Sequence, residues 1–251
     1  MKILITNTLF FILTAVILLS TVTCVEPDDT DDGDTSVYLG KTFNVTGEQV
    51  WMPNYNTGKI SEMFLKFTGD RDVDVIVIEL TDTPPYRSLQ KIGSSGEIKG
   101  GFLSFSVDAM SDNDLLNSDD LLHIYFNEWY EGGDNIVMKP EVKGNIITLV
   151  TLYDDDTSMP SEAIIKEGFY GTRTSLTGEY IYYLYVNADC TISAGKTVKT
   201  DLKYTFNEFK LSLKAGWNTI CKSETYTTTG DSSYSIKVEN PEIRWLIQGI
   251  K

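Results

Sequence analysis

Hydrophobic residues recur along the chain from Ser36 onward in patterns that are typical of β-strands. Residues 73–80 have the sequence Val-Asp-Val-Ile-Val-Ile-Glu-Leu, and this run of β-branched side chains predicts a buried strand. In residues 209–213 the apolar positions alternate with Lys210 and Ser212, which predicts a strand with one buried face. Similar segments predict further strands at 37–45, 62–67, 121–126, 146–153, 180–186, 196–206, 217–222, 234–239 and 243–247.

Glycine-rich turns separate these predicted strands. In residues 97–107, Gly100 and Gly101 supply the positive φ angles that a two-residue hairpin turn needs, and alternate residues after the turn form one apolar face. Strands that follow one another at intervals of about 8–12 residues, with turns of this kind, indicate an all-β fold. We therefore expect one or more antiparallel β-sandwiches built from Greek-key or meander hairpins.

The strand pattern is interrupted between Asp154 and Gly178. Ser158 can cap a helix, Pro160 suits its first turn and Gly168 suits its end, so the pattern predicts one short helix near 159–167. The expected organisation is then an N-terminal β-sandwich at 37–157, a linker with the short helix at 158–178, and a C-terminal β-rich half at 179–251. The same pattern also allows the two halves to pack together as one unit.

The first residues have a different pattern, that of an export signal. Lys2 precedes an apolar run, Leu9–Leu19, which is too short for a membrane-spanning helix of about 20 residues but suits a signal peptide at 1–23. Six of the nine residues from Glu26 to Asp34 are acidic. Such a segment cannot bury enough apolar surface to fold, and its like charges extend it. Residues 24–36 are therefore expected to form a flexible acidic tether.

A cysteine directly after the signal peptide, Cys24, resembles the lipobox of bacterial lipoproteins. The resemblance implies a lipid on the Cys24 thiol and a protein anchored at the bacterial cell envelope, on the outer surface or the periplasmic face. Thr21 and Thr23 stand where that family prefers leucine and a small residue. Two alternatives stay open: ordinary signal cleavage, for example after Thr23, which would give a secreted protein, and an uncleaved signal anchor.

The net charge restricts the partners of the folded part. The chain has a net charge of −15 at pH 7, and removal of residues 1–23 would take away Lys2 and no acid. This acidity argues against nucleic acid, because phosphates are bound by Lys and Arg. It also argues against docking on anionic lipid through charge alone. The expected contact with the membrane is therefore the lipid anchor itself.

A second resemblance concerns the body of the protein. The segment Leu211-Ser-Leu-Lys-Ala-Gly-Trp-Asn218, the Gly-Gly hairpin at 96–107 and Arg244-Trp245 resemble a set of uncharacterised bacterial lipoproteins with β-rich bodies. The resemblance rests on structural residues and covers about half of the mature chain. It implies an envelope location and no particular activity.

The residues that carry most enzymatic chemistry are few. His123 is the single histidine, and no nucleophile elbow accompanies it, so a hydrolytic triad is not expected. Zinc sites need several Cys or His ligands, and we expect neither a metal nor a cofactor. If Cys24 carries lipid, Cys190 and Cys221 remain. They could form a disulfide in an exported protein, or they could be two buried thiols.

Aromatic residues provide the best indication of binding. Tyr180, Tyr182, Tyr183 and Tyr185 lie in one predicted strand, where alternate residues point to opposite faces, so one pair would face the core and the other would face outward. Such side chains can contact sugars or proteins, although ordinary β-propensity also explains them. Trp129 and Tyr130 are the other candidate ligand contacts.

The leading hypothesis is therefore a lipid-anchored binding protein of the cell envelope. The ligand is unknown, and a protein, peptidoglycan or another polysaccharide would suit it. One alternative is a carbohydrate-active enzyme in which Glu128 or Glu131 acts as an acid beside Trp129. A second alternative is a structural subunit of an envelope complex.

Overall fold

A computed structural model describes residues 36–53, 64–80, 87–127, 136–151, 162–172, 175–199, 204–227, 230–237 and 243–249. They all belong to one compact unit, Asp34–Lys251. The helical segments are η3 (Asp112–Asp114), α2 (Ser118–Leu121) and a π-helical turn, η4 (Leu122–Asn127). The strands are β1 (Ser36–Gly40), β2 (Phe43–Pro53), β3 (Phe64–Lys66), β4 (Arg71–Leu80), β5 (Arg87–Lys99), β6 (Phe102–Val107), β7 (Val137–Lys139), β8 (Gly144–Thr151), β9 (Glu162–Thr172), β10 (Ser175–Val186), β11 (Cys190–Ala194), β12 (Thr197–Lys199), β13 (Tyr204–Phe206), β14 (Phe209–Leu213), β15 (Gly216–Thr227), β16 (Ser232–Lys237) and β17 (Arg244–Gly249).

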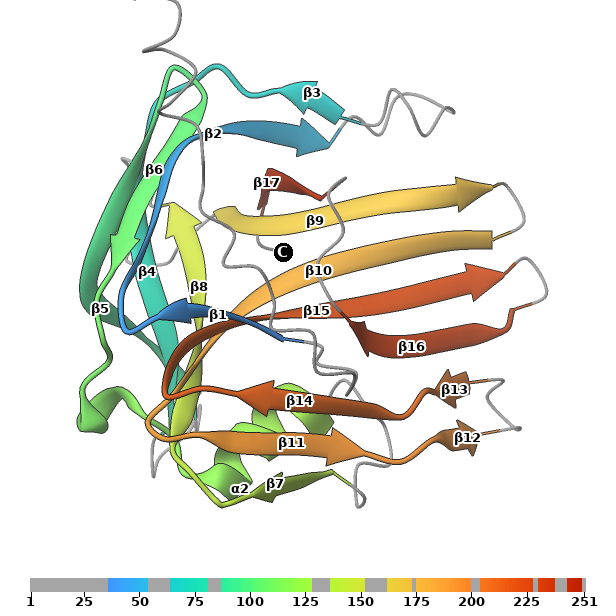
Figure 1. Cartoon of the computed structure of the whole chain (residues 1–251). Coiled ribbons are helices and arrows are strands. Elements are labelled where there is room, and N and C mark those ends of the chain that lie inside the picture. Colours follow the sequence, from blue (N-terminus) through green and yellow to red (C-terminus); the bar gives the residue numbers. More distant parts are fainter. Residues whose placement is uncertain are drawn as a thin grey trace, which may run out of the picture. The chain divides into compact units, whose positions relative to one another are not determined.

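Seven of the described strands close into a barrel, in the order β8, β4, β5, β6, β2, β17, β9 and back to β8. Neighbouring strands of this ring are antiparallel except β2 and β17, which are parallel. The β9–β10 hairpin carries the sheet outward from the barrel to β15 and β16 (Figure 1). Segments that are far apart in the sequence thus share one large sheet.

The first core, which we call the barrel core, is filled by aromatic and β-branched side chains from the barrel strands and from β10 and β15. The ring of Tyr183 stacks on Phe43 at 5.0 Å and on Trp245 at 5.9 Å between ring centres. Phe105 and Trp217 meet this stack edge-on. These residues come from β2, β6, β10, β15 and β17, so the stack holds together strands from both ends of the chain.

A second core lies on the other side of β8, β10 and β15. Along β10, for example, Ile181 packs into the barrel core while Leu184 packs into this second core. A smaller sheet, in the order β14, β11, β7, covers the second core together with α2 and η4. Figure 1 shows β14, β11 and β7 side by side next to the helical segment. The strands between the two cores are therefore buried on both faces.

The predicted hairpin at 97–107 is confirmed. Strands β5 and β6 pair with Lys99 opposite Phe102, and the turn between them consists of Gly100 at φ 56° and Gly101 at φ 85°. Leu103 and the two alternate residues after it are buried, as the alternation predicts. The local pattern was sufficient here because the turn type and the register depend on neighbouring residues.

The all-β fold class is confirmed, with strands that run mostly antiparallel and include the meander β4–β5–β6. A sandwich is not clearly formed, because the main sheet closes on itself as a barrel.

The predicted helix near 159–167 is wrong from Glu162 onward, where the chain is strand β9; residues 159–161 lie outside the described residues. Residues of the predicted linker, 158–178, thus form much of the β9–β10 hairpin. Pairing of β9 on both edges outweighs its local helix signals.

The predicted strand at 121–126 is also wrong, because these residues form the end of α2 and the turn η4. The side chain of Asn117 caps α2 by accepting a hydrogen bond from the Asp120 N–H at 2.9 Å. Asp119 and Asp120 then lie in the first turn, where negative charge favours a helix. The apolar run itself has no periodicity that would distinguish a helix from a strand.

Candidate functional site

Several of the candidate residues from the sequence lie outside the described residues. These are Cys24, Glu128, Trp129, Tyr130 and Glu131. The lipid anchor and the carbohydrate-active site near Trp129 therefore stay predictions. His123, which lies in η4, has an exposed side chain.

The tyrosines of β10 do not form one exposed face. Tyr183 lies in the barrel core, and Tyr185 packs against that core with its ring 5.2 Å from the Trp217 ring. Burial, and then the charge of Asp112, raises the pKa of Tyr185. On the other face, Tyr182 packs against the second core and Tyr180 is half-buried. The expected division into a core-facing and an outer pair is replaced by two packed faces.

Cys190 and Cys221 are not joined in a disulfide, and both are buried thiols, which is the second of the two alternatives. Cys221 belongs to the barrel core, whereas Cys190 belongs to the second core. The sheet that contains β10 and β15 lies between these cores, which explains why the two thiols do not meet. Burial, with the nearby charge of Asp189, raises the pKa of Cys190 to about 11.

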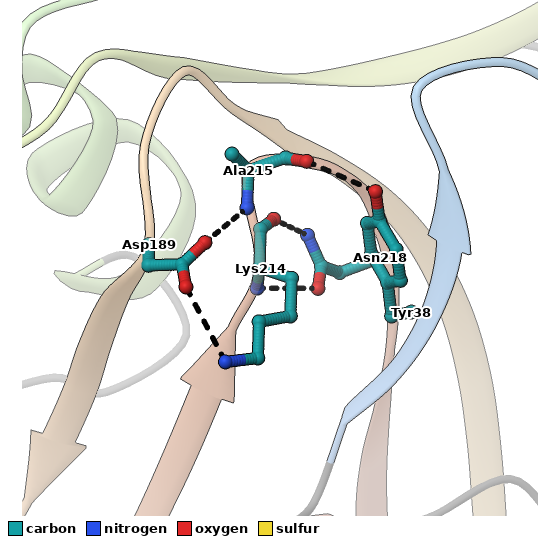
Figure 2. Close-up of polar contacts among 5 residues, drawn as sticks. All are labelled: Tyr38, Asp189, Lys214, Ala215 and Asn218. Carbon is teal, nitrogen blue, oxygen red and sulfur yellow. Dashed lines mark hydrogen bonds and ion pairs between the residues drawn. The ribbon is translucent and has the colours of Figure 1, made fainter.

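Residues 214–218, with the sequence Lys-Ala-Gly-Trp-Asn, connect β14 to β15 and take part in a polar network (Figure 2). Asp189 accepts hydrogen bonds from the Ala215 N–H at 2.8 Å and from the Lys214 ammonium at 3.3 Å. The Tyr38 hydroxyl donates to the Ala215 carbonyl at 3.2 Å. Asn218, which is fully buried, bonds both the N–H and the carbonyl of Lys214. These bonds join β1, β11, β14 and β15.

This network is a structural one. The hydrogen bond from the Ala215 N–H, followed by the one from the Lys214 side chain, lowers the pKa of Asp189. The carboxylate therefore stays ionised and holds the start of β11 to the turn. Most bonds of the network fix backbone groups, and the ion pair of Lys214 with Asp189 joins the same turn, so these residues serve the connection between the two sheets.

A cluster of two aromatic and two cationic side chains lies on β2, β3 and β17, and we call it the Trp51 cluster: Trp51, Phe64, Lys66 and Arg244. The Arg244 guanidinium carbon lies 4.8 Å from the centre of the Trp51 ring and 5.5 Å from that of Phe64. The Lys66 ammonium lies 5.8 Å from the Trp51 ring centre. Both cations are exposed, whereas the two rings are half-buried.

Strand register brings these residues to one face. Trp51 on β2 pairs with Lys66 on β3 and with Leu246 on β17. Arg244 lies two residues before Leu246, so its side chain is on the same face of the sheet as those of Trp51 and Lys66. Val50, which precedes Trp51, is fully buried in the barrel core. Since adjacent strand residues point to opposite faces, the cluster lies on the outside of the barrel wall.

A side-chain amide supports this part of the wall. Beside β2, strand β3 ends at Lys66 and strand β6 begins at Phe102 after the hairpin turn, and the Gln49 amide bonds backbone at this junction. Its Nε2 donates toward the carbonyl oxygens of Val50, Phe67 and Gly101 at 2.7, 3.1 and 3.0 Å. Gly101 also donates to the Gly69 carbonyl at 3.1 Å. The backbone under the cluster is therefore held by several bonds.

The electrostatics of the Trp51 cluster differ from those of the chain as a whole. The chain carries 36 acidic residues against 21 basic ones, yet no carboxylate of the described residues forms an ion pair with Lys66 or Arg244. Among the described residues, the positive charges of Lys66 and Arg244 thus lie over aromatic rings and not against carboxylates. The cluster was not predicted from the sequence, because its members are far apart along the chain. The available signal was a cation close to an aromatic residue in both Phe64-Leu-Lys66 and Arg244-Trp245.

Two further features concern the described residues alone. The described residues contain no group of three or more His, Cys, Asp or Glu side chains that could hold a metal ion. No helix among them has both the length and the apolar character that a membrane crossing requires.

Comparisons with known proteins give no relative for this chain. No family model matches it, and searches of curated proteins and of solved structures found no match.

Proposed function

We propose that this chain is an exported binding protein, anchored at the bacterial cell envelope by lipid on Cys24, that binds an anionic ligand at the Trp51 cluster. The observation that carries the binding proposal is the position of Arg244, which is exposed and lies over the rings of Trp51 and Phe64 in a strongly acidic chain. The signal peptide, the cysteine that follows it and the acidic tether support the location.

The stacking suits Arg244 for anion binding. An arginine loses side-chain freedom when it binds, and two rings that already hold the guanidinium reduce this cost. Stacking uses the flat faces of the guanidinium and leaves its N–H groups at the edge, where they match a carboxylate, sulfate or phosphate. Lys66 adds a second positive charge on the same ring.

Binding can be tested with full-length protein in mild detergent, by affinity electrophoresis through gels that contain dextran sulfate or neutral dextran. We expect retardation by dextran sulfate alone. Arg244→Gln combined with Lys66→Gln should weaken it about tenfold or more, since each change removes a charged hydrogen-bond donor. The control Lys143→Gln with Lys196→Gln removes two exposed charges outside the cluster. No retardation, or equal weakening by both pairs, would show that the cluster does not bind anions.

The anchor needs a separate experiment. Cells that express the wild type should incorporate isotope-labelled palmitate into the protein, and cells that express Cys24→Ala should not. Thr23→Ala serves as the matched control, because it keeps the thiol and brings the preceding residue closer to the lipobox pattern. Equal labelling of the wild type and Cys24→Ala would refute the anchor.

A further inference from the structure

The outer face around the Trp51 cluster also carries an exposed aromatic ring. Phe102 is 49% exposed at the start of β6, and Leu103 beside it is fully buried in the barrel core, so Phe102 points outward. Phe102 pairs with Gln49, which is two residues before Trp51 on β2. Phe102, on β6, and Trp51, on the neighbouring strand β2, therefore lie on the same outer face.

The arrangement on this face is mixed. Exposed Phe102 offers an apolar ring, while Lys66 and Arg244 offer positive charge over rings that are half-buried. A ligand that uses the whole face must present apolar surface and separated negative charges together. A linear polysaccharide of carboxylated sugars does this, because each ring has an apolar C–H face and a carboxylate at its edge.

We propose that the ligand of this face is an acidic polysaccharide of carboxylated sugars. Its carboxylates bind Arg244 and Lys66, and a sugar ring packs on Phe102. This inference rests on the proposed function, and it adds the chemical class of the ligand. Arg244 suits a carboxylate because the planar guanidinium can donate two parallel hydrogen bonds to it.

Charge density distinguishes this ligand from other polyanions. Double-stranded DNA is stiff and carries one negative charge for about every 1.7 Å of its axis, so it lays many phosphates along a protein surface and needs many cations along its path, whereas a flexible polyanion such as dextran sulfate can reach the cluster with a short segment. The cluster offers two cations, Lys66 and Arg244. The chain as a whole has a net charge of −15, so it repels phosphates that lie beyond these two cations. An anionic lipid surface meets the same repulsion. A polymer whose carboxylates are separated by sugar rings places fewer charges against the acidic body.

The decisive comparison uses polygalacturonate and its methyl ester, which has the same backbone without free carboxylates. Full-length protein in mild detergent would be titrated with each polymer, with dextran sulfate and with phosphatidylglycerol vesicles, at about 0.15 M salt so that distant charges are screened. We expect binding of polygalacturonate, none of the ester, and weak or no binding of the vesicles. Arg244→Gln should weaken polygalacturonate binding about tenfold or more.

Two variants separate this class of ligand from a general anion. Phe102→Thr should weaken polygalacturonate binding several-fold and leave dextran sulfate binding unchanged, because it removes ring contact and no charge. Arg244→Lys keeps the positive charge but lacks the planar guanidinium with its two parallel N–H donors, so this variant should bind polygalacturonate more weakly than the wild type. Thermal unfolding of each variant would confirm that it is folded.

The results distinguish the two proposals. Binding of dextran sulfate or vesicles at the cluster without binding of polygalacturonate would overturn the polysaccharide inference and leave the anion-binding function in place. Equal binding of polygalacturonate and its ester, or no effect of Phe102→Thr, would also overturn the inference. Failure of every anion to bind would remove both proposals.

Discussion

The side-chain amide of Asn218 satisfies both backbone polar groups of Lys214, four residues earlier. The Lys214 N–H donates to Oδ1 of Asn218 at 3.1 Å, and Nδ2 of Asn218 donates to the Lys214 carbonyl at 2.9 Å. The same Nδ2 donates to the Gly216 carbonyl at 3.0 Å. Figure 2 shows how this amide lies inside the turn that takes the chain from the small sheet to the large one. A side chain thus takes the place of backbone pairing where the chain changes sheets.

Replacement of Asn218 should therefore destabilise the fold. Asn218→Ala removes three hydrogen bonds at a fully buried position, and we expect the free energy of unfolding to fall by about 2–4 kcal/mol. Urea unfolding followed by tryptophan fluorescence measures this change. Asp189→Ala, which removes an exposed carboxylate from the same turn, should have a smaller effect. A larger loss for Asp189→Ala would mean that the turn depends on its ion pair.

The hairpin glycines allow a matched comparison. A Cβ on Gly101 would lie 2.0 Å from the Phe67 carbonyl oxygen, which is a backbone atom, whereas a Cβ on Gly100 would meet nothing within 4 Å. Both residues have positive φ, so Gly100→Ala should cost about 1–2 kcal/mol through conformation alone. Gly101→Ala should cost about 3 kcal/mol or more, because β3 must also move. Similar losses for the two variants, measured by urea unfolding, would contradict this account.

Much of the strand content could be predicted from the sequence, because strand residues are recognised from their immediate neighbours. The β5–β6 hairpin and the alternation of Phe209–Leu213 both follow from local pattern, and both are present. Closure of the barrel could not be predicted in this way. Strand β9 has local helix signals, and it becomes a strand because β17 and β10 pair with its two edges. Such pairing depends on residues far along the chain.

The candidate site illustrates the same limit. The tyrosines that the sequence pattern indicated lie together in β10, and the fold buries or half-buries them. The Trp51 cluster instead joins residues of β2 and β3 with Arg244 near the other end of the chain. The parallel pairing of β2 with β17 creates this contact, and no local pattern indicates which cation will lie over which ring.

The central position of Tyr183 in the barrel core makes a further prediction. Tyr183→Ala removes the ring between Phe43 and Trp245, so it should lower the free energy of unfolding by about 3–5 kcal/mol. Tyr180→Ala, at a half-buried position on the other face of the same strand, should cost clearly less. Chemical denaturation of both variants measures the difference. If Tyr180→Ala were the more damaging change, the stack would not be the main support of the core.

The Cys190 thiol should make stability depend on pH in the alkaline range. Its pKa is raised to about 11 from an ordinary value of 9.0, first by burial and then by the charge of Asp189. Between these two values the unfolded chain releases the proton while the folded protein retains it. The unfolded state therefore binds fewer protons, and the free energy of unfolding falls as pH rises. The contribution of the neutral thiol is fully present below pH 9.0 and is lost as the pH passes through about 11.

Urea unfolding of the wild type and of Cys190→Ala at several pH values tests this dependence. The stability advantage of the wild type over Cys190→Ala should be constant up to about pH 8.5 and should shrink toward pH 10.5, because alanine has no proton to lose. Asp189→Asn, which removes the neighbouring charge, should lower the pKa of Cys190 only partly, since burial is the larger cause. The rate of iodoacetamide alkylation against pH gives the thiol pKa directly. An advantage that stayed constant through pH 10.5 would place the thiol in contact with water, contrary to its position in the second core.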